Sequence, residues 1–437
     1  MIKIKTRLLL LPLTMICLIS SGCQKQSPGT RDTDAHKAET ITLMASRNWI
    51  RDVDLELFDK YKEETGVTVT VLTPPDHGYD SLLISSLSGG TTAIDMFMFH
   101  SGSVARSAGI PSIALDLSGE PWVGRLEEWA RSTNTHDGRL LGFSTWGIDY
   151  EGILYNKTFF QENDLAVPDT WDGFLSLCGQ IKALGTYPLY ESINSNWHAQ
   201  EWFYAATPIL NRENPNFVHQ LNLSVDNKFS ELSGLKPALE QIRALMADTS
   251  LYTHEDTADD WLGSYRALKN REAVMMASYS AIASELVDDY GSEDEWGMFP
   301  IPLCDNTVAV SNGGGPSKYI NKNSQNIDIC LDFLDFMARP ENLEIYYESR
   351  TDLVSAAFQN VKAAKPTTAT TEILERSTQT PQTMMMKELL HWDPNIYQYM
   401  QGFANETLSV DEFIDHIDRY RASMLKTDTG TTFKKLY

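Results

Sequence analysis

The chain has 437 residues, of which 42% are hydrophobic, and it carries a formal net charge of −23. This length is typical of about two domains with cores of their own, and the negative charge disfavours a nucleic-acid partner or an anionic lipid surface. Beyond residue 23, Cys178, Cys304 and Cys330 form no CxxC motif. The sequence therefore predicts neither a disulfide framework nor a zinc site.

Residues 1–22 have the pattern of a secretory signal peptide: basic residues, a short apolar run over 8–19, then small residues. The sequence SSGC that ends at Cys23 resembles a bacterial lipobox, in which Cys23 would become the first mature residue and carry lipid such as palmitate. Ser20 departs from that pattern, because an aliphatic residue is usual there. The alternative is an ordinary signal followed by a chance cysteine. On the lipobox interpretation, the protein is exported and held at the extracytoplasmic face of the cell membrane.

The polar residues 23–39 are predicted to be a flexible tether, and regular structure is expected to start after them. A short strand is predicted over 41–44, and a helix follows whose apolar face includes Ile50, Val53, Leu57, Phe58 and Tyr61. Gly66 is expected to end that helix in a left-handed cap. A strand over 67–71, a helix over 79–87 and a buried strand over 94–99 come next. This alternation is typical of an open, doubly wound α/β domain with parallel strands.

A second α/β region is predicted from about residue 142, beginning with an extended crossing segment over 142–155. Helices are expected over 171–184, 272–287 and 327–337, because apolar residues recur there at helical spacing. Extended segments are expected over 295–303 and 307–310, the first because Pro300 and Pro302 disfavour a helix. The rest of the chain is expected to be helical.

Taken together, these segments resemble the extracellular solute-binding proteins of ABC importers, in the family 1 group that mostly serves carbohydrates. The motifs that carry the resemblance are distributed along the chain after residue 40: ITLMASRNW, EETGVTVTVL, TTAIDMFMFHSG, YNKTFF with PDTWDGFLSLC, KNREAVMMASYS and VSNGGGPSKYINKNSQNIDICLDFLDFMARPENLEIY. The resemblance implies two α/β lobes joined by hinge crossings, with a ligand enclosed between them and a membrane permease as partner.

The expected crossings lie near residues 144–147, 300–303 and 350–354. They divide the chain into a first lobe of residues 40–145 and 303–350 and a second, helix-rich lobe of residues 146–302 and 351–437. We expect a monomer.

A sugar offers apolar C–H faces and a ring of hydroxyls, so its site needs aromatic rings together with polar side chains or backbone groups. In open α/β sheets such groups are expected beyond the carboxyl ends of the strands. For each aromatic residue the alternative is ordinary packing, and for the histidine it is a capped loop. The candidate ligand-binding residues are Asn48, Trp49, His100, Ser101, Trp146, Asp149, Tyr150, Glu191, Trp197, Trp202, Tyr279, Asn312 and Gly313.

Several other motifs are discounted. The glycine run at 313–315 lacks the GK[ST] ending of a phosphate loop, and a tight backbone approach is expected there instead. The acidic run over 288–295 lacks calcium-loop spacing, and no HExxH motif occurs. GFSTW at 142–146 ends in Trp where a nucleophile elbow has Gly. No metal, cofactor or catalytic residue is therefore expected.

The function expected from the sequence is that of a lipid-anchored receptor, not an enzyme. It would capture a carbohydrate, and the many aromatic residues favour an oligosaccharide over a monosaccharide. Two alternatives stay open at this point. A secreted carbohydrate-active enzyme, similar to a glycoside hydrolase, would need two carboxylates flanking a glycosidic bond. A surface adhesin could use the same fold without transport.

Overall fold

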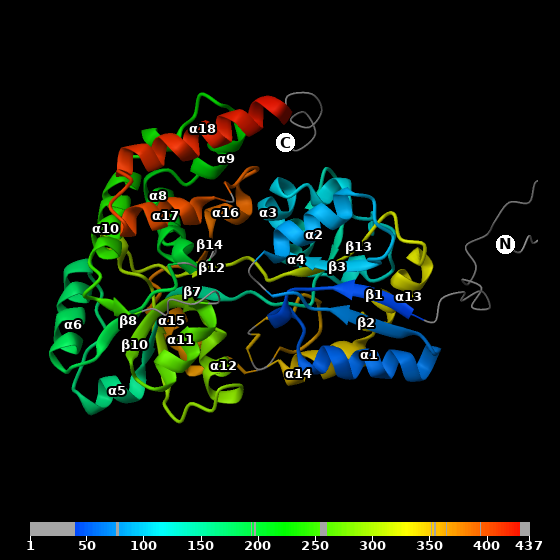
Figure 1. The fold of residues 1–437 in the computed structure, drawn as a ribbon, viewed down its shortest axis with the longest axis horizontal. Helices are drawn as coiled ribbons and strands as arrows, with labels where there is room; N and C mark the ends of the chain where they lie inside the picture. The colour runs from blue at the N-terminus through cyan, green and yellow to red at the C-terminus, as the bar shows by residue number, and fades with distance from the viewer. Residues whose placement is uncertain are drawn as a thin grey trace, which may run out of the picture. The chain divides into compact units, whose positions relative to one another are not determined.

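The computed structural model describes residues 40–75, 78–193, 195, 198–253, 260–350, 352–353, 355–363, 365–393 and 395–428. The predicted signal peptide, Cys23 and the predicted tether lie outside these residues. The described chain forms a mixed α/β fold of two lobes, each built around its own β-sheet (Figure 1).

The first lobe contains a five-stranded sheet in the order β2-β1-β3-β13-β6. As predicted, β1 pairs in parallel with both β2 and β3, whereas β13 is antiparallel to β3 and β6. The strands are β1 (Thr40–Met44), β2 (Thr68–Leu72), β3 (Met96–Phe99), β6 (Gly142–Phe143) and β13 (Ser317–Ile320). The helices of this lobe are α1 (Asp52–Thr65), α2 (Tyr79–Ser88), α3 (Gly102–Ser107), α4 (Glu128–Thr133), α13 (Ile327–Met337) and α14 (Pro340–Ser349).

Both faces of this sheet are buried, as the continuous apolar run of β3 indicates. Met96 and Met98 belong to a core shared with α1, α13 and α14, while Phe97 and Phe99 belong to a second core shared with α2 and α3. This alternation follows from the two-residue repeat of a strand. The predicted left-handed cap of α1 is confirmed: Gly66 has φ 79° and its N–H donates to the carbonyl of Lys62.

The second lobe is built on a larger, mixed sheet in the order β14-β12-β7-β10-β8-β9, with β11 also paired to β7. Its strands are β7 (Tyr150–Asn156), β8 (Tyr187–Tyr190), β9 (Tyr252–Thr253), β10 (Ala273–Tyr279), β11 (Trp296–Phe299), β12 (Val310–Ser311) and β14 (Gln382–Thr383). Its helices include α5 (Lys157–Glu162), α6 (Trp171–Ala183), α7 (Glu201–Tyr204), α8 (Ala206–Glu213), α10 (Leu235–Ala247), α11 (Asp260–Lys269), α12 (Ile282–Asp288), α15 (Thr368–Arg376), α16 (Met385–Glu388), α17 (Ile396–Ala404) and α18 (Val410–Asp428).

One predicted helix is wrong. Residues 273–279 form the central strand β10, and only the C-terminal part of the predicted segment, α12, is helical. β10 is antiparallel to β7 and parallel to β8, and its residues 273–278 are buried. A short apolar run buried on both faces of a sheet has no alternation by which to distinguish it from a buried helix.

Two of the three crossings between the lobes lie at other residues than expected. The passage near residues 144–147 lies between β6 of the first sheet and β7 of the second. The next passage follows β12, between Ser311 and Ser317, and not residues 300–303. Leu353, Ala357 and Phe358 belong to the first core, so the chain returns to the second lobe only after residue 358. The strand expected over 307–310, which the expected crossings assign to the first lobe, is observed as β12 (Val310–Ser311) in the sheet of the second lobe.

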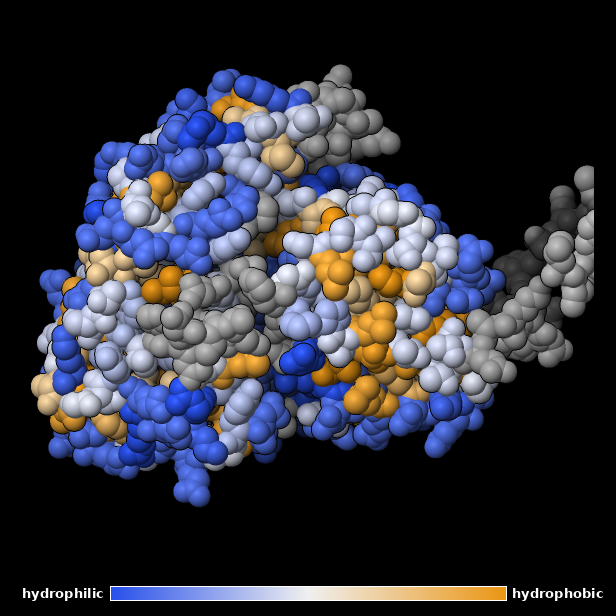
Figure 2. Space-filling view, viewed as in Figure 1, coloured by the Kyte–Doolittle hydropathy of each residue, from blue (hydrophilic) through white to orange (hydrophobic). Residues whose placement is uncertain are grey.

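The surface shown in Figure 2 is largely hydrophilic, with hydrophobic patches over the first lobe near α2 and strands β1 to β3. The polar surface agrees with the high content of acidic residues in the chain. Among the helices that the structure describes, none combines the length and the apolar character needed to cross a membrane.

Candidate functional site

The first lobe places aromatic rings at the carboxyl ends of two neighbouring strands. Trp49 ends the short helix η1 (Arg47–Trp49) after β1, and His100 directly follows β3. Their rings meet edge to face with centroids 4.9 Å apart, and Trp49 meets Tyr79 of α2 in the same way at 5.2 Å. Ser101, buried, occupies the N-cap position of α3. Trp49, His100 and Ser101 therefore lie at one edge of the first sheet, where they were expected.

His100 is held as a neutral imidazole. Burial, aided by the positive charge of Lys387, lowers the pKa of His100 to about 3. A neutral imidazole donates one hydrogen bond and accepts another, which suits contact with a hydroxyl group.

The second lobe brings together predicted residues from three strands. The backbone N–H of Asp149 donates to the Asn312 side-chain oxygen at 3.0 Å, and the N–H of Asn312 donates to the Asp149 carbonyl at 3.0 Å. The hydroxyl of Ser280 and the N–H of Ala281 both donate to Oδ1 of Asp149. This meeting follows from antiparallel pairing, because the start of β7 lies beside the ends of β10 and β12.

Asp149, Tyr150, Tyr279 and Asn312 therefore lie close together, although up to 163 residues separate them along the chain. Burial, and then the neighbouring charge of Glu151, raises the pKa of Asp149 well above its usual value. Gly313 has φ 64°, a left-handed conformation that glycine adopts without strain, and Asn312 accepts from the N–H of Gly314 at 2.9 Å. The predicted tight turn is thus observed.

Trp146 lies between two arginines that the sequence analysis did not single out. The guanidinium carbon of Arg350 is 4.4 Å from the centroid of the indole, and that of Arg51 is 6.0 Å away. A Cβ added at Gly315 would lie 2.5 Å from the indole, so the ring packs directly on the glycine turn. The buried Nε1 of Trp146 has no hydrogen-bond partner among the residues described. It is therefore available to a ligand or a water molecule.

Arg51 also connects the lobes. It precedes α1 in the first lobe, and its guanidinium lies 2.5 Å from the carboxylate of Glu285, in α12 of the second lobe. The hydroxyl of Tyr279 donates to the same carboxylate at 3.4 Å. We refer to Arg51, Trp146, Asp149, Tyr279, Glu285 and Asn312 as the inter-lobe cluster.

A buried acidic pair lies next to this cluster. The carboxyl groups of Glu151 on β7 and Glu201 on α7 are both buried and interact with each other. Burial raises the pKa of Glu151 to about 7, and burial and the charge of Glu151 raise the pKa of Glu201 well above its usual value. Lys387, whose Nζ donates to the Gly314 carbonyl at 3.3 Å, has a pKa lowered by burial to about 8. Glu151 and Lys387 therefore both have pKa values close to neutral pH.

Two of the candidate ligand-binding residues, Trp202 and Glu191, are buried in the second lobe. Trp202 is fully buried, and its ring packs on those of Trp171 and Phe174 in the core of the second lobe. Its indole N–H donates to Glu191 at 2.7 Å, and Glu191 is itself 1% exposed. We therefore place Glu191 and Trp202 in the core and not in the inter-lobe cluster. The side chain of Asn48, and Trp197 as a whole, lie outside the described part of the chain.

The acidic run near residue 290 is used for ion pairs. Asp294 binds Arg271 at 2.5 Å and accepts from the Asn156 amide at 2.6 Å, and Glu295 pairs with Lys157 at 3.2 Å. Within the described residues, no group of His, Cys, Asp and Glu side chains is arranged to hold a metal ion.

The sequence analysis missed Arg51, Glu285, Arg350 and Lys387. Arg51 follows the polar-aromatic end of the first strand, a position that could have drawn attention to it. Glu285, Arg350 and Lys387 lie within helical or loop segments with no distinguishing motif, so only the tertiary structure reveals them.

Comparison with known proteins identifies the family of this chain. The profile of the family described as bacterial extracellular solute-binding protein matches residues 56–375, well over half of the chain. The chain belongs to this family. These proteins are defined by solute binding, not by catalysis, and the expectation that the protein is not an enzyme is confirmed.

Two curated relatives of this solute-binding protein match part of it. A multiple sugar-binding protein of Streptococcus mutans is 25% identical over 214 residues, which cover 45% of this chain and 47% of the relative. An erythritol/L-threitol-binding protein of Mycolicibacterium smegmatis is 26% identical over 159 residues, covering 32% and 33% of the two chains. The chain thus spans less than half of the length of these relatives.

Solved structures show the same fold over nearly the whole chain. The mannobiose complex of an ABC-transporter binding protein from Bifidobacterium animalis has a TM-score of 0.66 at 17% identity and covers 91% of this chain and 96% of that one. A binding protein from Bacillus subtilis in an open conformation has a TM-score of 0.64 at 17% identity, covering 90% and 99%. At such identities the likeness shows the fold, and the predicted two-lobe fold is confirmed.

Proposed function

We propose that this solute-binding protein captures a carbohydrate, in particular an oligosaccharide, at the inter-lobe cluster and delivers it to an ABC import permease. The observation that carries the proposal is that Arg51 of the first lobe contacts both Glu285 of the second lobe and the face of Trp146. Arg51 thus links the indole of Trp146 to a carboxylate of the second lobe. A ligand seated there would hold the lobes together by contacting both of them.

The chemistry of the cluster, together with Trp49 and His100 at the edge of the first sheet, suits a neutral polyhydroxylated ligand. Trp49, Trp146 and Tyr279 are partly exposed rings that can pack on sugar C–H faces. The neutral His100 and the side chain of Asn312 can exchange hydrogen bonds with hydroxyl groups. The relatives and solved structures that the chain resembles include a sugar-binding protein and a mannobiose complex, and these support a carbohydrate ligand.

The test is to incubate the purified protein with a panel of monosaccharides and oligosaccharides while following its melting temperature and any change in the sugars. We expect one sugar class to raise the melting temperature with no product formed, and Trp146→Ala to remove that shift. Sustained hydrolysis of the sugar, or stabilisation that survives Trp146→Ala, contradicts the proposal.

We propose further that the protein is exported and lipid-anchored through Cys23, a proposal supported by the sequence of residues 1–23 alone. In cells fed labelled palmitate, the native chain should be labelled and recovered with membranes. Cys23→Ser should abolish labelling and release the protein. Unchanged membrane recovery of Cys23→Ser contradicts the anchor but leaves the sugar-binding proposal intact.

A further inference from the structure

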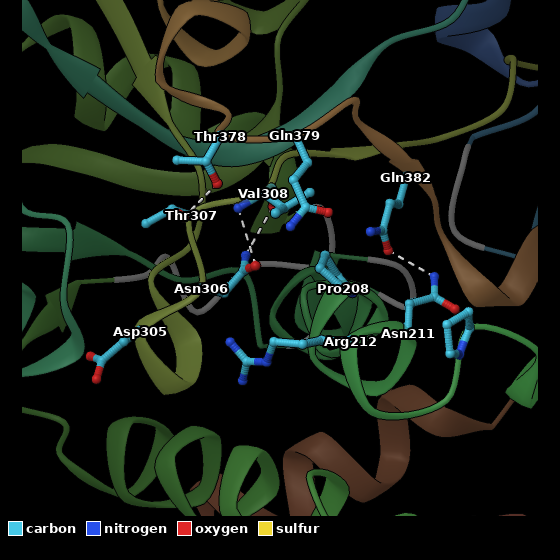
Figure 3. A pocket seen from close by; sticks show the side chains of 11 residues that line it. Pro208, Asn211, Arg212, Asp305, Asn306, Thr307, Val308, Thr378, Gln379 and Gln382 are labelled. Carbon is cyan, nitrogen blue, oxygen red and sulfur yellow. Dashed lines mark hydrogen bonds between the residues drawn. The ribbon is translucent and has the colours of Figure 1, made fainter.

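A separate pocket of about 570 Å³ opens in the second lobe, lined by α8, the loop around residues 305–308 and the loop that leads into β14 (Figure 3). None of its lining residues belongs to the inter-lobe cluster. Pockets that bind small molecules span about 300–1,000 Å³, so the volume suits a small ligand.

The pocket contains an arginine without an ionic partner. Arg212, in the last turn of α8, forms neither an ion pair nor a hydrogen bond with any residue that the structure describes. Acidic side chains are abundant in this chain, and two other arginines of the second lobe, Arg266 and Arg271, pair with carboxylates. The five N–H groups of Arg212 are therefore available to a ligand.

Acceptors lie in the same pocket. Asp305 uses one carboxylate oxygen to accept from the N–H of Trp171 at 3.0 Å, and its second oxygen has no hydrogen-bond partner among the described residues. Asp305 and the preceding Cys304 have φ values of 56° and 49°, in the left-handed region that non-glycine residues adopt at a cost. In Figure 3 the carboxylate of Asp305 and the guanidinium of Arg212 lie on the same side of the pocket.

Other polar side chains of the pocket use only part of their hydrogen-bonding capacity. The amide nitrogen of Asn211 donates to the side-chain oxygen of Gln382 at 2.7 Å, which leaves the oxygen of Asn211 and the nitrogen of Gln382 for a ligand. The hydroxyls of Thr307 and Thr378 share one hydrogen bond of 2.9 Å, so one hydroxyl proton remains to be donated.

The pocket is thus lined by both hydrogen-bond donors and hydrogen-bond acceptors, and this combination favours one class of ligand. An anion could use Arg212 but would meet the carboxylate of Asp305, and a cation would meet Arg212. A hydroxyl group donates one hydrogen bond and accepts two, so it can use both kinds of neighbour. We propose that this pocket binds a small neutral polyhydroxylated molecule, such as a monosaccharide or hexitol, at a site separate from the inter-lobe cluster.

The experiment uses the full chain and ligand-observed saturation-transfer NMR. The probes are D-glucose, D-galactose, D-mannose and D-mannitol, with D-glucuronate and D-glucosamine as charged counterparts. Arg212→Met removes the donors, and Thr378→Trp fills the mouth of the pocket from an exposed position. Arg419→Met is the matched control, because Arg419 is 64% exposed on α18 and pairs only locally with Asp415.

We expect at least one neutral probe to bind, Arg212→Met to weaken it roughly tenfold, Thr378→Trp to abolish it and Arg419→Met to leave it unchanged. Binding should persist in Trp146→Ala, which separates this site from the proposed function. The proposal is overturned if no neutral probe binds, if glucuronate or glucosamine binds better, if Thr378→Trp has no effect, or if Trp146→Ala removes all binding.

Discussion

The guanidinium of Arg51 lies 2.5 Å from the carboxylate of Glu285, joining the start of α1 in one lobe to α12 in the other. Glu285 is only 7% exposed, whereas Arg51 is 24% exposed. The same carboxylate accepts from the hydroxyls of Tyr265 and Tyr279, so it is held in place before Arg51 meets it. A prepositioned anion on one lobe and a cation on the other favour approach of the two lobes.

Arg51→Met should therefore weaken ligand binding roughly two- to fivefold, because a partly exposed ion pair contributes up to about 1 kcal/mol. Affinity is measured by calorimetry with the best sugar of the panel, and the radius of gyration by X-ray scattering. Arg266→Met is the control, since its ion pair with Glu272 at 2.9 Å lies within the second lobe. Equal effects of the two substitutions would contradict a role for Arg51 in bringing the lobes together.

Gly315→Ala should displace Trp146, because the added Cβ would lie 2.5 Å from the indole ring. We expect a change in tryptophan fluorescence and a loss of sugar affinity of about tenfold or more, given that aromatic contacts contribute on the order of 1 kcal/mol or more. Gly179→Ala in α6 is the control, since nothing lies within 4 Å of its added Cβ. It should leave binding unchanged and stabilise the fold by about 0.5–1 kcal/mol.

Glu151→Gln should change how stability depends on pH. The pKa of Glu151 is raised in the folded state to about 7, so its protonated form stabilises the fold fully below its ordinary value of 4.5, and this contribution is lost as pH rises through about 7. Glutamine cannot ionise, so the variant should gain stability relative to the native chain between about pH 5 and pH 8, by up to about 3 kcal/mol.

Chemical denaturation of both proteins across that pH range measures this difference. Glu272→Gln, on an exposed carboxylate of the same lobe, should show no comparable trend. A constant difference between Glu151→Gln and the native chain at every pH contradicts the buried acidic pair as its source.

Lys318→Met should destabilise the first lobe. The ammonium of Lys318 lies 3.1 Å from Asp54, and the two side chains are 1% and 0% exposed. Removing one partner leaves a buried charge without compensation, at a cost of about 3–5 kcal/mol. Lys236→Met, which breaks an exposed pair with Asp411 of 2.6 Å, should cost much less stability in the same denaturation experiment, because solvent screens an exposed pair. Similar losses in the two variants would contradict this account.

The sequence was sufficient for the local structure of the first lobe. The helix before Gly66 and the parallel strands around it follow from apolar spacing and a left-handed cap, which are properties of neighbouring residues. It also identified Trp49, His100, Trp146 and Asn312 as groups suited to a sugar, because side-chain chemistry does not depend on the fold.

Only the tertiary structure decided which of these groups meet. Asp149 and Asn312 adjoin through pairing of β7 with β12, and Arg51 and Glu285 meet across 234 residues of chain. Trp202, with the same side chain as Trp146, is instead buried in a core. A local sequence pattern shows which residues are apolar, aromatic or charged. Contacts between segments that are distant in the chain depend instead on strand order and on the packing of whole helices and strands. The fold class was therefore predictable from the sequence alone, whereas the membership of the inter-lobe cluster was not.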